Sequence, residues 1–223
     1  MGLLDALLGR SKPVRPNLDQ LFAIPSAAVT LESGADLAPT GLGSVCFATV
    51  EGGVFKQLQR DVRDLLDADR ERGGIPVEFS QDEYGYTWLL ARHSPDDVAS
   101  LVNDLHAVNT LLSEGGFGPQ LLCSLVGFRS VGAPGTGRAQ EATDGGEESA
   151  RPPSGTGGRT RYSSLALVYL YKRGTFYPFA PVPGVSEKRD NELELQVRGM
   201  LTDDLPVETD LSRWFPVWGA PGL

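Results

Sequence analysis

The sequence predicts an α+β fold, in which helices back an antiparallel sheet, and three patterns carry this prediction. Large apolar residues alternate with other residues over 165–171, which is the period of a strand. Apolar residues recur every three or four positions over 54–70 and over 98–112, as in helices that pack on a core. From Val45 onward the segments follow in the order β-α-β-β-α-β, which is typical of a ferredoxin-like core. A secretion-chaperone-like α+β fold is the alternative.

Residues 1–16 combine an amphipathic segment with a linker and precede the predicted domain. In a helix, the leucines of this segment would share one side: Leu3, Leu4, Leu7 and Leu8. Arg10 and Lys12 follow them, so the helix could lie among lipid headgroups with its basic residues at the phosphates. It could equally dock on its own domain or fray. We therefore take the leucines as candidate contacts for a membrane or a partner.

Residues 17–223 are expected to form a single domain, which begins with short elements. In chain order the patterns predict a helix over 17–22, strands over 27–31 and 45–50, a helix over 54–70, and a hairpin with strands over 76–80 and 86–92.

The next helix has the clearest signals at its start. Ser94 can cap it, Pro95 fits the first helical position, and Asp97 adds an acidic first turn. Its apolar row consists of Val98, Leu101, Val102, Leu105, Val108 and Leu112. The pattern therefore predicts a helix with one buried side.

A long hairpin follows, with strands over 121–128 and 165–172. Between them, residues 132–161 contain no Val, Ile, Leu, Met, Phe, Tyr or Trp. Such a stretch cannot bury enough apolar surface to offset the entropy of ordering it. We therefore predict a disordered loop insertion over 131–161, which a hairpin tolerates because the entropy of loop closure grows slowly with length.

The second strand of this hairpin ends in a basic turn. Lys172 and Arg173 precede Gly174, which can adopt the positive φ of a tight turn. Pro178 cannot donate to a sheet ladder, so the return strand is expected at the sheet edge or as a short piece. The hairpin is expected to present a cationic, aromatic tip. A solvated turn is the simpler interpretation of Lys172 and Arg173, and contact with lipid phosphates or an acidic protein surface is the functional one.

The C-terminal part combines an acidic helix with a tryptophan-rich end. A helix is predicted over 187–201, and residues 187–210 contain eight carboxylates against three basic residues. A solvated helix surface explains this pattern, and a docking surface for a basic partner is the alternative. Trp214 and Trp218 lie in the final residues, which we expect to clasp a sheet or helix. A partner-binding surface is again the alternative.

Composition limits the classes of partner and compartment. The net charge of −9 argues against nucleic acid as a partner, because phosphate binding needs a basic surface. Cys46 and Cys123 lie in apolar, strand-like runs, which predicts buried free thiols. No stretch approaches about 18 apolar residues. No signal peptide is visible either, so we expect a cytoplasmic protein.

The titratable residues form no catalytic or metal-binding motif. His93 and His106 are the two histidines, and neither has a cysteine or a second histidine at metal-ligand spacing. Cys123 and His106 could be imagined as a nucleophile and its base, but no motif flanks Cys123. We therefore predict no catalytic, cofactor-binding or metal-binding residues, and a protein that is not an enzyme.

Several blocks of sequence point, when read together, to one known family. They are GLLDALLGRSK at 2–12, IPSAAVTLE at 24–32, GLGSVCF at 41–47, YGYTWL at 84–89, and longer blocks over 104–128, 167–181 and 189–223. In combination they resemble the actinobacterial PspA-associated protein PspAB family over nearly the full chain except the insertion. None of the blocks is a catalytic motif.

The resemblance implies an accessory role in the phage-shock, or envelope-stress, response. Members of that family are linked to the membrane-remodelling protein PspA and often to a membrane zinc protease of the HtpX type. We therefore expect a non-enzymatic protein that binds a PspA-like protein, with that protease as a second partner, peripherally at the inner face of the cell membrane. The alternative is a chaperone-like adaptor for peptides or proteins, with a groove lined by Trp88, Tyr169, Tyr171 and Trp214.

Overall fold

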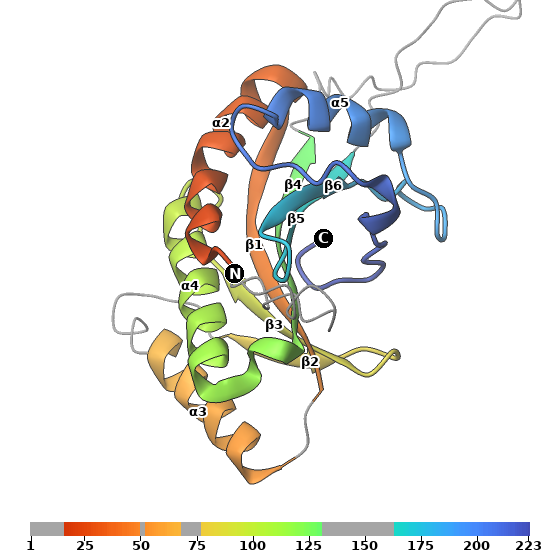
Figure 1. Ribbon diagram of the computed structural model, residues 1–223. Helices are drawn as coiled ribbons and strands as arrows, with labels where there is room; N and C mark the ends of the chain where they lie inside the picture. Colours follow the sequence, from red (N-terminus) through yellow and green to blue (C-terminus); the bar gives the residue numbers. More distant parts are fainter. Residues whose placement is uncertain (1–15, 50–51, 68–76, 131–162) are drawn as a thin grey trace, which may run out of the picture.

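A six-stranded antiparallel sheet forms the middle of the molecule in a computed structural model (Figure 1). The structure describes residues 16–49, 52–67, 77–130 and 163–223. The strands are β1 Leu37–Ala48, β2 Glu78–Gln81, β3 Tyr86–Arg92, β4 Leu121–Ser130, β5 Ser164–Leu170 and β6 Thr175–Phe179. They lie in the order β2-β3-β1-β4-β5-β6, and each neighbouring pair is antiparallel.

Helices cover one face of this sheet. The α-helices of the described residues are α2 Ile24–Ala35, α3 Gly53–Asp67, α4 Val98–Leu112 and α5 Asn191–Leu201. In Figure 1, α2, α3 and α4 lie together on one side of the strands. α2 and α4 pack on β1, whereas α5 packs on α2 and β6. The predicted apolar row of α4 is confirmed, because all six of its residues are buried.

The strand order confirms the ferredoxin-like core. β1, α3 and β2 form a β-α-β unit, and β3 lies between its two strands, which is the split arrangement. After α4, β4 pairs with the other side of β1, and the β5–β6 hairpin extends the sheet beyond β4. The prediction of an α+β fold with a hairpin extension is therefore correct.

The strand predicted over 27–31 is wrong, because these residues belong to α2. Pro25 lies in the first turn of α2, where a missing N–H costs no hydrogen bond. Ile24, Ala27, Ala28 and Leu31 are buried at helical spacing. The first strand is instead β1, which begins at Leu37. Pro39 and Gly41 interrupt its first half, so the sequence pattern revealed only the second half.

The cap of α4 is Asp97 and not Ser94. The Asp97 carboxylate accepts a hydrogen bond from the Ser100 N–H at 3.0 Å, and the helix begins at Val98. Ser94 lies one turn earlier, where its carbonyl accepts from the Asp97 N–H at 2.9 Å. α5 also begins later than predicted, after Asp190, whose carboxylate accepts from the Leu193 N–H at 3.1 Å.

Pro178 was correctly predicted to place its strand at the sheet edge. β6 is the last strand of the sheet, and β5 is its one neighbouring strand among those described. The outer side of β6 pairs briefly with the chain around Val207. There the Phe176 N–H donates to the Pro206 carbonyl at 2.9 Å, and the Glu208 N–H donates to the Phe176 carbonyl at 2.7 Å. This pairing satisfies an edge that would otherwise offer free hydrogen-bonding groups.

The chain after Pro206 covers the other face of the sheet, and we call residues 206–223 the C-terminal strap. Figure 1 shows it in dark blue on the side opposite α2 and α4. It completes a second core with sheet residues; the buried members of that core are Cys46, Trp88, Cys123, Leu125, Ala166, Val168, Tyr177, Phe179, Trp214 and Ala220. The clasp expected for the tryptophan-rich end is therefore present. Cys46 and Cys123 are free and buried, as predicted.

Two predicted segments lie outside the described residues. They are the amphipathic segment with Leu3, Leu4, Leu7 and Leu8, and the insertion over 131–161. The two strands that flank the insertion meet directly, because the Ser130 N–H donates to the Ser163 carbonyl at 2.9 Å.

Candidate interaction surface

A groove of about 360 Å³ opens between α2, the start of α4 and the start of β1. We call it the α2–α4 groove. Ala28 and Val29 of α2, Pro39 of β1, and Val98 and Ala99 of α4 form its apolar part. Ala28, Pro39 and Val98 are buried, whereas the Val29 side chain is 68% exposed. The small size of most of these side chains leaves the hollow between the elements.

The backbone fixes the walls of this groove. Asp36 follows the last residue of α2, adopts a left-handed conformation with φ of 53° and turns the chain straight into β1. Gly41 in β1 has φ of 76°, and a Cβ at this position would overlap with the carbonyl oxygen of His93. The His93 N–H donates to the Gly41 carbonyl at 2.8 Å. The chain that leads into α4 is therefore held against β1.

The rim of the groove is acidic. Glu32 of α2 and Asp96 before α4 line it, and both are exposed. The sequence contains no Lys or Arg over 16–55 and none over 93–128, so both helices of the groove lack lysine and arginine. An exposed apolar hollow with acidic edges suits an apolar side chain that is flanked by lysine or arginine.

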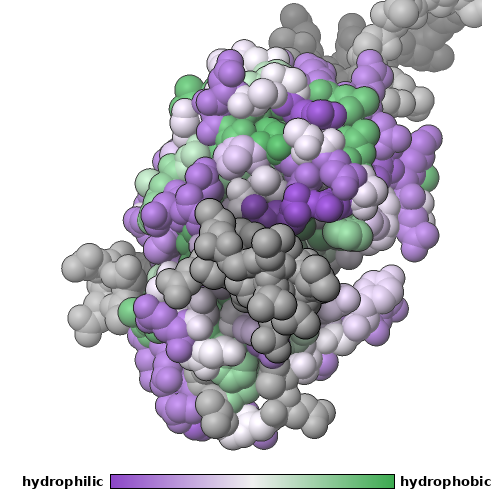
Figure 2. All heavy atoms as spheres, in the orientation of Figure 1, coloured by the Kyte–Doolittle hydropathy of each residue, from purple (hydrophilic) through white to green (hydrophobic). Residues whose placement is uncertain are grey.

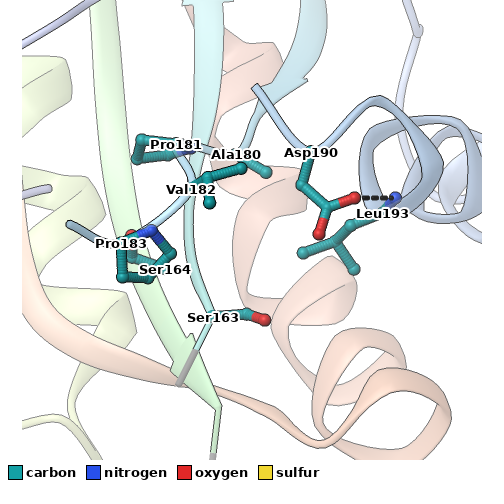
Figure 3. Close-up of a pocket in the computed structure, with 8 residues that line it drawn as sticks. All are labelled: Ser163, Ser164, Ala180, Pro181, Val182, Pro183, Asp190 and Leu193. Carbon is teal, nitrogen blue, oxygen red and sulfur yellow. Dashed lines mark hydrogen bonds between the residues drawn. The ribbon is translucent and has the colours of Figure 1, made fainter. Parts of the chain in front are cut away.

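A second hollow is too small to bind an organic ligand. It holds about 20 Å³, which is room for one water molecule, beside β5 and the start of α5 (Figure 3). Asp190 lies at its edge in Figure 3, but its carboxylate already accepts the hydrogen bond from Leu193. This hollow therefore offers no candidate site.

The basic turn between β5 and β6 differs from the cationic, aromatic tip expected of it. Lys172 is exposed, but Arg173 pairs with Glu208, with 3.3 Å between Nε and Oε2. Tyr169 and Tyr171 are buried, so the tip presents neither ring. The Tyr169 hydroxyl donates to the carbonyl of Asn17 at 2.8 Å. The hairpin thus anchors the start of the described chain.

The structure places Trp214 inside the second core and Trp218 at its margin. Trp214 is 5% exposed, stacks on Tyr177 with 6.0 Å between ring centroids, and donates from Nε1 to the Glu208 carbonyl at 3.1 Å. Trp218 is half-buried and packs edge-on against Phe179, with 4.8 Å between ring centroids. Both rings therefore serve the packing of the C-terminal strap.

Most carboxylates of the acidic stretch over 187–210 have a partner within the chain. Glu194 and Glu208 are buried and pair with Arg189 and Arg173. Asp204 accepts from the hydroxyls of Ser26 and Thr30, and Asp190 and Asp210 accept from backbone N–H groups. In Figure 2 the surface over α5 and the strap mixes hydrophilic and hydrophobic side chains. The acidic stretch is thus largely a set of internal contacts.

The aromatic groove of a chaperone-like adaptor and the Cys123–His106 pair of an enzyme would each need residues from one face of the sheet. The structure places the members of each set on opposite faces. Trp88 and Trp214 belong to the core under the strap, whereas Tyr169 and Tyr171 belong to the core under the helices. These four aromatic side chains therefore line no common groove. Cys123 likewise lies under the strap, whereas His106 on α4 contacts Asp19 on the helical side, with 3.6 Å between Nε2 and Oδ1.

The described residues contain no group of three or more His, Cys, Asp or Glu side chains that could hold a metal ion. Among the same residues, no helix has the length and apolar character needed to cross a bilayer.

The α2–α4 groove was missed by sequence reasoning because residues 27–31 were interpreted as a strand. The absence of Lys and Arg over 16–55 and 93–128 could have indicated an acidic surface on these segments. The net charge of the whole chain does not show where basic residues are missing.

A comparison with protein families gives one match. A family model described as PspA associated protein B matches residues 1–222. The chain belongs to the PspA associated protein B family. The resemblance inferred from the sequence blocks is therefore confirmed, and the name of the PspA associated protein B family states an association with PspA. Comparisons with curated proteins and with solved structures give no match.

Proposed function

We propose that this chain is a non-enzymatic accessory protein of the phage-shock, or envelope-stress, response that binds a PspA-like membrane-remodelling protein. The family name supports the partner. The acidic, partly apolar α2–α4 groove supports the mode of binding. The protein acts in the cytoplasm, peripherally at the inner face of the cell membrane, where the leucines of residues 1–16 add a weak contact with lipid.

The α2–α4 groove is suited to a helix of the partner that is apolar on one side and basic at its edges. Helices that dock in grooves insert apolar side chains at positions three and four apart. Val29 is the exposed apolar side chain that such a helix would cover. Glu32 and Asp96 would then face lysine or arginine side chains. Such charges at the edge of an interface act mainly on the association rate and on specificity.

A titration of the full-length protein with a PspA-like protein from the same source tests this proposal. Reversing both rim charges, with Glu32→Lys and Asp96→Lys, should weaken binding about tenfold, which corresponds to about 1.4 kcal/mol. Val29→Asp should weaken it further, because a carboxylate would then enter the apolar hollow. Glu83→Lys with Glu114→Lys is the matched control, since both residues are exposed and lie outside the groove.

Circular dichroism of each variant checks that the helices are retained. Unchanged affinity of both groove variants would contradict the groove as the site, whereas absence of binding by the wild-type protein would contradict the partner. A membrane protease of the same system is the second predicted partner, and its cytoplasmic part can be titrated in the same way.

A further inference from the structure

The two cysteines of the chain face each other across two neighbouring strands. Cys46 lies near the end of β1 and Cys123 near the start of β4, and they are direct partners in the β1–β4 register. The sequence contains no other cysteine. Both thiols are free, with side-chain exposures of 3% for Cys46 and 7% for Cys123. Two residues far apart in the sequence are thus brought together by the sheet.

The spacing of such a pair is close to that of a disulfide. Directly opposite residues in antiparallel strands have Cβ atoms about 4.5–5.5 Å apart, and a disulfide spans about 3.5–4.5 Å between Cβ atoms. The β1–β4 register shifts between Cys46 and Phe47, next to the pair. An irregularity of this kind bends and twists the strand locally, so a small adjustment brings the sulfur atoms into bonding range.

The surroundings keep these thiols unreactive while they are covered. A hydrogen bond with Cys123 is the main cause that raises the pKa of the Cys46 thiol, and burial raises it further. The reactive species of cysteine is the thiolate, so the covered Cys46 thiol reacts slowly at neutral pH, and burial keeps an oxidant away from both sulfur atoms. Reaction therefore requires that the cover opens.

The cover is the C-terminal strap. Tyr177, Trp214 and both cysteines belong to the same core cluster. The Tyr177 hydroxyl donates to the Phe215 carbonyl at 2.7 Å, and its ring stacks on Trp214. On the other side, Trp88 is the neighbour of Cys46 in the β1–β3 register. Trp88 and Trp214 lie in this cluster, so their fluorescence can report on the oxidation state of the two cysteines.

We propose that Cys46 and Cys123 are a site of reversible oxidation, at which a hydroperoxide closes a disulfide when the C-terminal strap opens. One thiolate attacks the peroxide, the O–O bond breaks, and the alcohol or water leaves with a proton, which yields a sulfenic acid. The second thiol then attacks the sulfenic sulfur, the S–S bond forms, the S–O bond breaks and water leaves. The two thiols are oxidised to one disulfide. The hydroperoxide is reduced to an alcohol and water, or to two water molecules when it is hydrogen peroxide.

Treatment of the full-length protein with hydrogen peroxide tests the site. We expect the intact mass to fall by two hydrogens, a non-reducing digest to contain one peptide pair that joins Cys46 to Cys123, and dithiothreitol to restore both thiols. Tryptophan fluorescence should fall on oxidation, since a disulfide quenches nearby indoles. Cys46→Ser and Cys123→Ser should each abolish the linked peptide pair.

Three results would overturn the site. They are sulfinic or sulfonic acid without the linked peptides, disulfide-linked dimers as the main product, and retention of both thiols under conditions that oxidise the urea-unfolded chain.

A pair of variants tests the cover. Trp214→Phe removes the hydrogen bond from the indole to the Glu208 carbonyl, keeps an aromatic ring, and should raise the oxidation rate severalfold. Val62→Ala shortens a buried side chain of α3 on the helical face and should leave the rate near that of the wild type. An equal acceleration in both variants, or none in Trp214→Phe, would show that the strap does not control access.

Discussion

Arg189 and Glu194 join the start of α5 to the C-terminal strap. Their Nε and Oε1 atoms are 2.9 Å apart, and Glu194 is 2% exposed. The same carboxylate oxygen accepts from the Ala180 N–H at 2.8 Å, and Nη1 of Arg189 donates to the Trp214 carbonyl at 2.7 Å. One ion pair thus links the end of the sheet, a helix and the strap.

Glu194→Ala should therefore strongly destabilise the fold. It would leave Nε of Arg189 and the Ala180 N–H without their acceptor, and breaking a buried pair in this way costs about 3–5 kcal/mol. Because Arg189 keeps partial contact with solvent, we expect the lower end of that range. Urea unfolding measures the change, and Glu192→Ala, at an exposed position of α5, should stay within about 0.5 kcal/mol of the wild type. Equal stability of the two variants would contradict the role assigned to the pair.

The ion pair of Glu208 should make stability depend on pH. Burial raises the pKa of Glu208, but hydrogen bonds from the Asp210 N–H, the Thr175 hydroxyl and Arg173 outweigh it, and the net pKa is lowered. A carboxyl with a lowered pKa in the folded state stabilises the fold above its unfolded pKa, near 4.5, and loses this contribution as the pH falls through the folded value.

Glu208→Gln should accordingly be less stable than the wild type at pH 7, and the gap should narrow below about pH 4. Urea midpoints at several pH values measure both effects. Glu83→Gln is the control, because Glu83 lies exposed in the β2–β3 turn. A gap that stays constant from pH 7 to pH 3 would speak against the proposed charge state of Glu208.

The position of the α4 cap gives a prediction that separates two neighbouring polar residues. Asp97→Ala should cost about 1 kcal/mol, since it removes the acceptor of the Ser100 N–H. Ser94→Ala should change the unfolding free energy by less than about 0.5 kcal/mol, because the backbone carbonyl of Ser94 makes the turn. A larger loss of stability in Ser94→Ala than in Asp97→Ala would instead identify Ser94 as the cap.

The leucine-rich segment should account for any binding to lipid. Deletion of residues 2–10 should weaken binding to vesicles that contain anionic lipid, because it removes Leu3, Leu4, Leu7, Leu8 and Arg10. Co-sedimentation at low and physiological salt measures this binding. Lys172→Ala tests the hairpin turn separately. If the truncated protein binds as well as the full chain, the leucines are not the lipid contact.

Periodicity predicted the helices of the ferredoxin-like core because α3 and α4 each bury one side, and it predicted strands from the alternation of larger and smaller side chains, although both faces of β5 are buried. The rows of α4 and β5 are regular, and tertiary contacts reinforce what the local pattern already favours. α2 was missed because its alanines and β-branched residues resemble a short strand, and its helical spacing extends over few turns. The first half of β1 was missed because Pro39 and Gly41 interrupt its apolar alternation.

The interaction surface could not be derived from local patterns. The α2–α4 groove depends on how α2, β1 and the start of α4 meet, which no single segment encodes. The roles of Trp214 and Glu208 also depend on long-range contacts, because an exposed and a buried tryptophan look alike in sequence. The excess of carboxylates in the C-terminal part was visible, but their use as internal hydrogen-bond acceptors was not.

The contact between Ser130 and Ser163 makes the protein a convenient host for a reporter. The hydrogen bond from the Ser130 N–H to the Ser163 carbonyl holds the end of β4 beside the start of β5. Any peptide grafted between them starts and finishes at the same point, and its length affects the free energy of closure only logarithmically. A fluorescent domain inserted there would leave the helix-covered face and the strap untouched. The protein could then be followed in living cells without a tag fused to either terminus.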